Sequence, residues 1–218
     1  MKEKNILIIA GETSADIHGA NLVLALKSMD DDLRFFGIGG NRLKENGVEI
    51  IQDNKQMSIV GFVEVLKHYF FLKHVFNKIV NLCKNKKPIR AILIDYPGFN
   101  LRLAKELKKL NIPITYYISP QVWAWKENRV KIIKDCVDQM LCIFPFEEEW
   151  YKLRGVKAKY VGHPFSRIKI VNNKSRLDFY KKHNIDLSSK ILALMPGSRQ
   201  QEVNRHLEIM IESAKMIY

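Results

Sequence analysis

Asp95 is the residue whose type and position in this sequence best suit acid–base chemistry. It ends the stretch IRAILID (Ile89–Asp95), which is typical of a buried strand, and it lies between apolar Ile94 and Tyr96. Burial disfavours the charged form of a carboxyl group, so we expect a raised pKa and the capacity to accept a proton. Spacing alone favours a simpler role for Asp95, as a cap or turn residue before a helix that follows Asn100.

A second group of polar residues follows the apolar run Ile6–Ile9. In AGETSADIHG (Ala10–Gly19), either Ser14 or Asp16 would cap the next helix. Other predicted strands also end in polar or glycine-containing loops, namely GIGG, SPQVWAW and PGSR. Ligands of open parallel sheets bind beyond the carboxyl ends of the strands, so these ends together predict one shared cleft.

Three further stretches allow a binding role beside a structural one. Gly197, Ser198 and Arg199 precede a predicted helix and would suit a phosphate group, although neither they nor GIGGNRL fit a P-loop or a GxGxxG motif. Trp123 could stack on a ligand, although packing is commoner for aromatic residues. The helical pattern Val65–Cys83 suits either a core helix or a helix on an anionic membrane surface.

Short apolar runs alternate with helical patterns along most of the chain, which predicts an α/β fold with a Rossmann-like parallel sheet. Residues 165–175 are mostly polar, and we place a domain boundary there, between residues 1–170 and 171–218. A helix over Arg176–His183, a strand over Ile191–Met195 and the start of a further helix would open a second, incomplete domain. Packing of this tail onto the first domain is the alternative.

The composition limits the partners that this chain suits. Lys and Arg number 36 against 23 Asp and Glu, which favours an anionic partner such as a phosphorylated metabolite, an acidic membrane or a nucleic acid. The sequence has no helix-turn-helix, RNP or zinc pattern, so nucleic acid is the least favoured. The three cysteines lack metal-ligand spacing and suit reduced thiols. No run approaches the ~20 apolar residues of a membrane span, which predicts a soluble or peripheral protein.

Eight blocks of the sequence, in this order, resemble the lipid-A-disaccharide synthase family. Each block alone is a modest signal, but their order and the unusual SPQVWAW make the match specific. The resemblance runs from about Asn5 to the end of the chain through AGETSAD, GIGGNRL, MSIVGFVEVL, LIDYPGFN, YYISPQVWAWKENRVKII, FPFEEEWY, YVGHP and LMPGSRQQEV.

This resemblance implies an inverting glycosyltransferase of GT-B architecture, with two Rossmann-like domains facing a cleft. The family joins UDP-2,3-diacylglucosamine to 2,3-diacylglucosamine 1-phosphate and releases UDP, without a catalytic metal or a cofactor. It works in the cytoplasm at the inner face of the cytoplasmic membrane, binds no nucleic acid, and allows a homodimer at full length.

The resemblance also assigns roles to residues. Asp95 would be the catalytic base. Contacts to substrate would come from Glu12, Ser14, Asp16, Met57, Gly61, Glu64, Asn100, Gln121 and Trp123. Contacts to the UDP phosphates would come from Gly197, Ser198 and Arg199, and contacts to acyl chains or membrane from Phe62, Val65, Tyr69, Phe70 and Phe71.

The sequence departs from the family pattern at two positions and in length. Ala15 replaces a usual Gly, where a side chain would crowd a turn that needs a positive φ. Gly98 stands where a second Asp is frequent, and if that carboxylate is the essential one, Asp95 is not the base. The family's second domain is normally complete, so we expect this chain to be truncated and to have little or no transferase activity alone.

Two alternatives stay open at this point. One is another GT-B enzyme that uses a UDP-sugar, such as the peptidoglycan N-acetylglucosaminyl transferase or a UDP-sugar epimerase. The other is a non-catalytic remnant that binds a lipid or a nucleotide.

Overall fold

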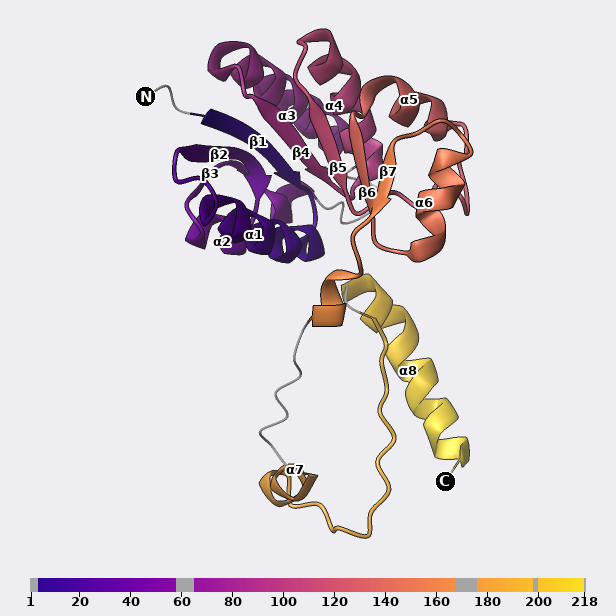
Figure 1. Cartoon of the computed structure of the whole chain (residues 1–218). Coiled ribbons are helices and arrows are strands. Elements are labelled where there is room, and N and C mark those ends of the chain that lie inside the picture. Colours follow the sequence, from indigo (N-terminus) through magenta and orange to yellow (C-terminus); the bar gives the residue numbers. More distant parts are fainter. Residues whose placement is uncertain (1–3, 58–64, 168–175, 198–199, 218) are drawn as a thin grey trace. The chain divides into compact units, whose positions relative to one another are not determined.

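The computed structural model describes residues 4–57, 65–167, 176–197 and 200–217 (Figure 1). The side chains of residues 65–68 and 167 lie outside this description. The chain divides into two compact units, Met1–Ile168 and Lys169–Tyr218, and each is described by itself.

The first unit is built on a parallel sheet, as the alternating pattern predicts. Within the described residues it has seven strands in the order β3-β2-β1-β4-β5-β6-β7. The chain runs from β1 outward to β3 and then returns to the middle with β4, so β1 and β4 are neighbours at the point of reversal. The strands are β1 (Lys4–Ala10), β2 (Leu33–Gly39), β3 (Val48–Asp53), β4 (Arg90–Ile94), β5 (Ile114–Tyr117), β6 (Gln139–Cys142) and β7 (Ala158–Tyr160).

Helices cover both faces of this sheet (Figure 1). Side chains alternate between the faces of a strand, so Ile6 and Ile8 pack with α1 and α2, while Leu7 and Ile9 pack with the helices of the other face. The helices are α1 (Thr13–Lys27), α2 (Asn41–Glu45), α3 (Val65–Lys86), α4 (Pro97–Lys109), α5 (Arg129–Cys136) and α6 (Pro145–Lys152), with 3-10 turns η1 (Asn54–Met57) and η2 (Pro164–Arg167).

The observed bounds differ from the predicted ones near the carboxyl ends of the strands. Helix α4 begins at Pro97, because proline suits the first turn of a helix, and Asn100 therefore lies inside it. Helix α1 begins at Thr13, so neither Ser14 nor Asp16 is its N-cap, and Glu12 holds that position. Ala15 is buried in α1 and does not have a positive φ, so its side chain crowds no turn.

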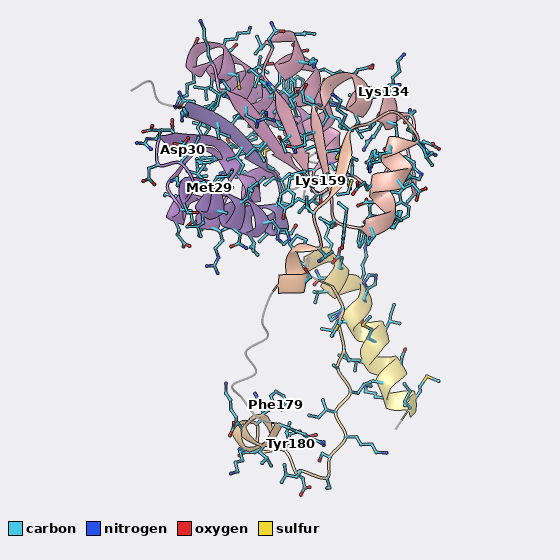
Figure 2. All side chains as sticks on the ribbon, viewed as in Figure 1. Met29, Asp30, Lys134, Lys159, Phe179 and Tyr180 are labelled. Carbon is cyan, nitrogen blue, oxygen red and sulfur yellow. The ribbon has the colours of Figure 1, made fainter. Side chains whose placement is uncertain are left out.

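The second unit contains α7 (Arg176–Lys182) and α8 (Gln200–Ile217). Phe179 and Tyr180 lie side by side on α7 (Figure 2). Their ring centres are 6.2 Å apart, and the Tyr180 hydroxyl donates a hydrogen bond to the carbonyl of Ser189 at 3.0 Å. The predicted strand over Ile191–Met195 is wrong, since these residues are exposed and pair with no strand that the structure describes. An apolar run becomes a strand only with a neighbour that completes its hydrogen bonds.

Candidate functional site

The carboxyl ends of β1 and β4 form the centre of the candidate site. Ala10 at the end of β1 is in register with Ile94 at the end of β4. Glu12 and Asp95 follow these two residues along the chain, so both acids lie at the point where the strand order reverses. Open parallel sheets bind their ligands at this point. The sequence prediction that Glu12 and Asp95 share one end of the sheet is confirmed.

The backbone between β4 and α4 is strained. Asp95 and Tyr96 have φ values of 44° and 47°, in the left-handed region, and Ile118 after β5 has a φ of 62°. Such a conformation is rare for residues with a bulky side chain and costs on the order of 1–3 kcal/mol for each residue. Neighbouring groups must therefore hold this turn in place.

Side chains from α4 and β5 supply that support. The Asn100 amide donates hydrogen bonds to the carbonyls of Asp95 and Ile94, at 2.7 and 3.2 Å. The Tyr116 hydroxyl donates to the same Asp95 carbonyl at 2.5 Å, and the Asp95 N–H donates to the carbonyl of Tyr117 at 3.1 Å. Asn100 and Tyr116 are fully buried. All these bonds are made to backbone atoms, which leaves the Asp95 carboxylate out of the support.

The surroundings of Asp95 make its carboxyl group a better proton acceptor. Burial raises its pKa, the nearby Glu12 carboxylate raises it further, and a hydrogen bond from the Tyr96 N–H acts in the opposite direction. Burial also raises the pKa of Tyr116 well above its ordinary value, so its hydroxyl stays protonated and keeps its donor role. A carboxylate with a raised pKa at a ligand-binding edge suits general base catalysis.

Tyr96 connects the turns after β1 and β4. Its ring lies against Gly11 so closely that a Cβ atom on Gly11 would be 2.5 Å from Cδ1 of the ring. Its hydroxyl donates a hydrogen bond to the carbonyl of Met57 at 3.1 Å. The Asn54 amide, in the same 3-10 turn, donates to the carbonyl of Glu12 at 3.1 Å. Gly11, Asn54 and Met57 therefore help to position the turns that carry the two acids.

Asp16 has a structural task in this arrangement. Its buried carboxylate accepts hydrogen bonds from the N–H groups of Gly40, Arg42 and Leu43, at 2.7, 3.0 and 3.2 Å. Asp16 thus satisfies N–H groups at the start of the short helix α2 and links α1 to the loop after β2. Ser14 is exposed on the first turn of α1. The substrate contacts predicted for Asp16 and Ser14 stay predictions.

The loop after β5 carries Gln121 and Trp123, both exposed. The Trp123 indole donates a hydrogen bond to the Glu147 carboxylate at 3.2 Å, and the Tyr151 hydroxyl donates to the carbonyl of Pro120 at 2.9 Å. These contacts fix the loop to α6. They show a structural role for Trp123, and its predicted substrate contact stays a prediction.

The other predicted residues are placed as follows. Met57 is buried, Tyr69 and Phe70 are exposed on α3, and Phe71 packs against the core. Gly197 belongs to the second unit and has a φ of 125°, which favours glycine. Outside the described residues lie Gly61, Phe62, Glu64, Ser198 and Arg199, and outside the described side chains lies Val65.

Sequence reasoning missed Asn54, Tyr96 and Tyr116 as parts of this site. Asn54 follows a strand that was not predicted, so its approach to Glu12 had no local signal. Tyr96 was interpreted only as an apolar neighbour of Asp95, and Tyr116 lies within an apolar run that predicts a strand. The adjacent Gly11 was the one clue to the Tyr96 ring, because a glycine allows a close approach.

Two comparisons of the sequence with known proteins agree on one family. The model of lipid-A-disaccharide synthetase matches residues 6–218. The lipid-A-disaccharide synthase of Coxiella burnetii (strain CbuK_Q154) is 41% identical over 217 residues, which cover 100% of this chain and 57% of the relative. That of Myxococcus xanthus is 44% identical over 212 residues, which cover 97% of this chain and 55% of the relative. The chain therefore spans about half the length of these curated relatives.

A search of solved structures supports the fold. The S. aureus MnaA–UDP co-structure has a TM-score of 0.57 and 13% sequence identity, and the match covers 83% of this chain and 50% of that one. At this identity the likeness shows the fold alone. None of the helices in the described part of the chain has the length and apolar character that crossing a membrane requires.

Proposed function

This chain belongs to the lipid-A-disaccharide synthetase family, and we propose that it forms the acceptor-binding part of an inverting glycosyltransferase. The substrates would be UDP-2,3-diacylglucosamine as donor and 2,3-diacylglucosamine 1-phosphate as acceptor. The product would be the β-1,6-linked disaccharide, released together with UDP. The relatives are about twice as long as this chain, so the proposal concerns the complete protein.

The proposed reaction needs one proton acceptor. The 6-hydroxyl oxygen of the acceptor attacks the anomeric carbon of the donor, and the bond from that carbon to the UDP oxygen breaks. The hydroxyl proton passes to the Asp95 carboxylate, and UDP leaves with the bonding electron pair. Gly98 has no side chain, so residue 98 offers no carboxylate as an alternative base.

The observation that carries this proposal is the position of Asp95. It lies on a strained turn at the reversal of the strand order, and Asn100 and Tyr116 hold the turn through backbone atoms. Its pKa is raised by burial and by Glu12. A raised pKa weakens the carboxylate's stability as an anion, which increases its tendency to take a proton from the hydroxyl group.

The remaining predicted residues have places in the same proposal. Glu12 and Ser14 would contact the acceptor beside Asp95, and Gln121 and Trp123 would contact the sugar from the loop after β5. Gly197, Ser198 and Arg199 would bind the UDP phosphates. A guanidinium and free N–H groups before a helix suit a diphosphate because they offer several charge-assisted hydrogen bonds.

The proposal also includes a location at the membrane surface. Tyr69 and Phe70 on α3 are 51% and 60% exposed, and the chain has a formal net charge of +13. Exposed aromatic side chains with a basic surface favour the anionic inner face of a membrane. Peripheral association, and a homodimer of the complete protein, are predictions of this proposal.

Replacing Asp95 by Asn in the complete-length protein tests the proposal. We expect turnover to fall by roughly 10²- to 10⁴-fold, because the amide cannot accept the proton. The fold should persist, since the hydrogen bonds that hold the turn involve backbone atoms of Asp95. The matched control is Asp30→Asn at the other end of the sheet, which should leave turnover within about twofold, as distant surface changes usually do.

The assay would follow release of UDP in the presence of both acylated sugars. Near-normal turnover of Asp95→Asn would exclude Asp95 as the base. Equal loss in both variants would show a general effect on folding, and would also contradict the assignment.

A further inference from the structure

A polar hollow of about 430 Å³ lies at the carboxyl end of β5, within the first unit. Its volume is in the range of small-molecule sites, roughly 300–1,000 Å³. The Tyr117 carbonyl accepts a hydrogen bond from the Asp95 N–H, so the hollow adjoins the proposed catalytic turn. Its wall combines helix α1, the last residue of β5 and the segment after β7, and it includes His18, Asn21, Tyr117, Gly162, His163 and Ser166.

Two side chains of this wall have polar atoms without a partner. In the described residues, no hydrogen bond involves a ring nitrogen of His18 or the hydroxyl group of Tyr117, although His18 is only 9% exposed and Tyr117 is half-buried. The fully enclosed polar atoms without a partner in the same residues belong to Asn100 and Ser119, so those of His18 and Tyr117 remain accessible to a ligand. Polar groups that have lost water without gaining a partner favour a ligand that supplies the missing hydrogen bonds.

His163 adds a hydrogen-bond donor to the wall. Its Nδ1 atom accepts a hydrogen bond from the Phe165 N–H at 3.2 Å, so the proton of the neutral ring is on Nε2. The Phe165 ring contacts both imidazoles, with its centre 5.3 Å from that of His18 and 5.4 Å from that of His163. The Ser166 hydroxyl donates to the carbonyl of His163 at 2.7 Å. These contacts hold both histidines in place before a ligand binds, which lowers the cost of binding.

The hollow suits an uncharged ligand. None of the described residues that line it is Asp, Glu, Lys or Arg. Burial lowers the pKa of His18, and the neighbouring His163 lowers it further, so the neutral imidazole is favoured near neutral pH. A wall of imidazole, amide and phenol groups offers donors and acceptors but no positive charge for a phosphate group. It is complementary to the hydroxyl groups of a sugar ring.

Resting on the proposed function, we propose that this hollow binds the glucosamine ring of one of the two substrates through its hydroxyl groups. His18 and Tyr117 then complete their hydrogen bonds with the ring, and His163 donates from Nε2. Tyr117 is in register with Ile94, the residue before Asp95, so a ring held here lies beside the carboxylate that takes the proton. Donor and acceptor share this ring chemistry.

Binding of N-acetylglucosamine to this chain tests the inference, followed by NMR through the Cε1–H signals of the six histidines. We expect saturable shifts of the His18 and His163 signals, with a dissociation constant in the millimolar range, because a single ring forms few contacts. The signals of the other histidines should stay in place and serve as an internal control. Absence of a saturable shift at His18 and His163 would overturn the inference.

Variants of similar shape test the assigned contacts. Tyr117→Phe removes only the hydroxyl group, and we expect binding to weaken about fivefold, as for one lost hydrogen bond. His18→Phe removes both ring nitrogens but keeps a ring against Phe165, and it should weaken binding about tenfold. The matched controls are Tyr160→Phe on β7 and His183→Phe, whose ring also packs against a phenylalanine, and each should change binding by less than about twofold.

Urea denaturation separates a loss of contacts from a loss of folding. The Tyr117 hydroxyl has no partner in the described residues, so Tyr117→Phe should not lower the free energy of unfolding. Binding of the sugar by folded Tyr117→Phe as tightly as by the unmodified chain would contradict the assigned contact and overturn the inference. Should His18→Phe fail to fold, Tyr117→Phe decides alone.

Charged ligands separate a sugar site from an anion site. Inorganic phosphate should shift the His18 and His163 signals less than the sugar does, because the wall carries no cation. Larger shifts with phosphate, growing below about pH 6 as imidazoles take up protons, would identify an anion site and overturn the inference.

Two further ligands that contain the same ring identify the substrate. Tighter binding of N-acetylglucosamine 1-phosphate than of UDP-N-acetylglucosamine assigns the hollow to the acceptor ring, and the reverse order assigns it to the donor ring. None of these measurements requires turnover. Failure of the Asp95→Asn test would therefore remove the proposed function and leave the sugar-binding result, whereas failure here would leave Asp95 as the base.

Discussion

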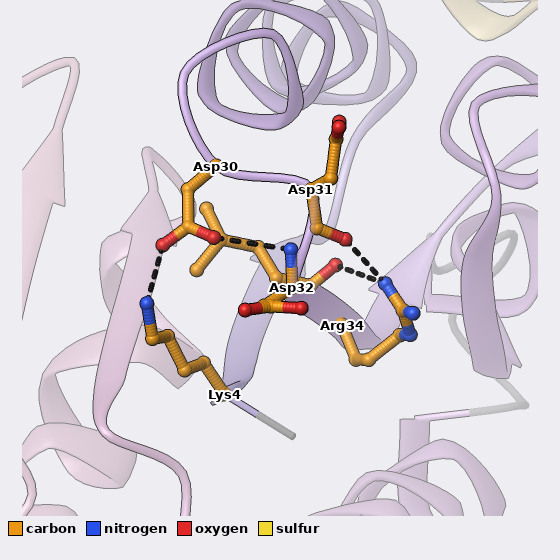
Figure 3. Close-up of polar contacts among 6 residues, drawn as sticks. Lys4, Asp30, Asp31, Asp32 and Arg34 are labelled. Atoms are coloured by element: carbon orange, nitrogen blue, oxygen red, sulfur yellow. Dashed lines mark hydrogen bonds and ion pairs between the residues drawn. The ribbon is translucent and has the colours of Figure 1, made fainter. Parts of the chain in front are cut away.

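Asp30, at the amino end of the central sheet, and Asp95, at its carboxyl end, are the same residue type in opposite surroundings. The Asp30 carboxylate accepts hydrogen bonds from Lys4 Nζ at 2.7 Å and from the Asp32 N–H at 3.0 Å (Figure 3). Those bonds lower the pKa of Asp30, whereas burial and the Glu12 carboxylate raise the pKa of Asp95.

The two ends of the sheet also differ in the kind of contact that the surrounding side chains make. At the amino end, exposed side chains pair with each other, as Lys4 does with Asp30, and such pairs contribute little because water competes for them. At the carboxyl end, buried side chains hold backbone carbonyls in a strained turn. The first arrangement pairs a charge with an opposite charge, and the second positions a carboxylate whose pKa is raised.

The largest effect on stability is expected from Asn100, which holds two carbonyls of the strained turn. Asn100→Ala should lower the free energy of unfolding by about 3 kcal/mol, because the turn loses two buried hydrogen bonds and the Asp95 carbonyl keeps only the one from Tyr116. Urea denaturation of this chain measures the change.

Asn46→Ala is the matched control near the amino end of β3. Its side chain donates one exposed hydrogen bond, to the carbonyl of Arg42 at 2.7 Å. Loss of an exposed bond should cost less than about 1 kcal/mol. Equal losses for the two variants would contradict the claim that the carboxyl end depends on buried support.

A smaller loss is expected where the chain approaches the Tyr96 ring. Gly11→Ala places a Cβ atom 2.5 Å from the ring and should cost about 2 kcal/mol, because the ring or the turn must shift. In a Tyr96→Ala background the same change should cost less than ~0.5 kcal/mol, as expected for a pairwise effect.

Gly98→Ala serves as the control for this comparison. The added methyl group meets no atom within 4 Å, so no loss of stability is expected. If Gly11→Ala were as harmless as Gly98→Ala, the close packing of Tyr96 on the first turn would be wrong.

The central strands could be predicted from the sequence because they are buried on both faces. Ile6–Ile9 and the run before Asp95 are apolar throughout, and this is the pattern that a covered parallel strand requires. The edge strand β3 (Val48–Asp53) was missed, since only Val48 in it is fully buried and its polar residues resemble a loop. The apolar run over Ile191–Met195 was predicted as a strand and is not one, because a strand also needs a neighbouring strand, which the run itself does not specify.

The acids of the candidate site could be predicted, but their supporting contacts could not. Glu12 and Asp95 follow recognisable strands, and the topology of a parallel sheet brings such ends together. The capping of α2 by Asp16 joins residues that are 24 or more positions apart in the chain. The support that Asn100 gives to Asp95 depends on where α4 begins. Both follow from packing, which no local pattern specifies.

The most direct test of this account is a carbon-13 NMR titration of the aspartate carboxyl groups in this chain. We predict that Asp95 titrates above the ordinary aspartate pKa of about 3.9 and Asp30 below it. Glu12→Gln should lower the midpoint of Asp95, because it removes a like charge, and should leave that of Asp30 unchanged. An Asp95 midpoint equal to or below that of Asp30 would contradict the claim that this end of the sheet prepares a carboxylate to accept a proton.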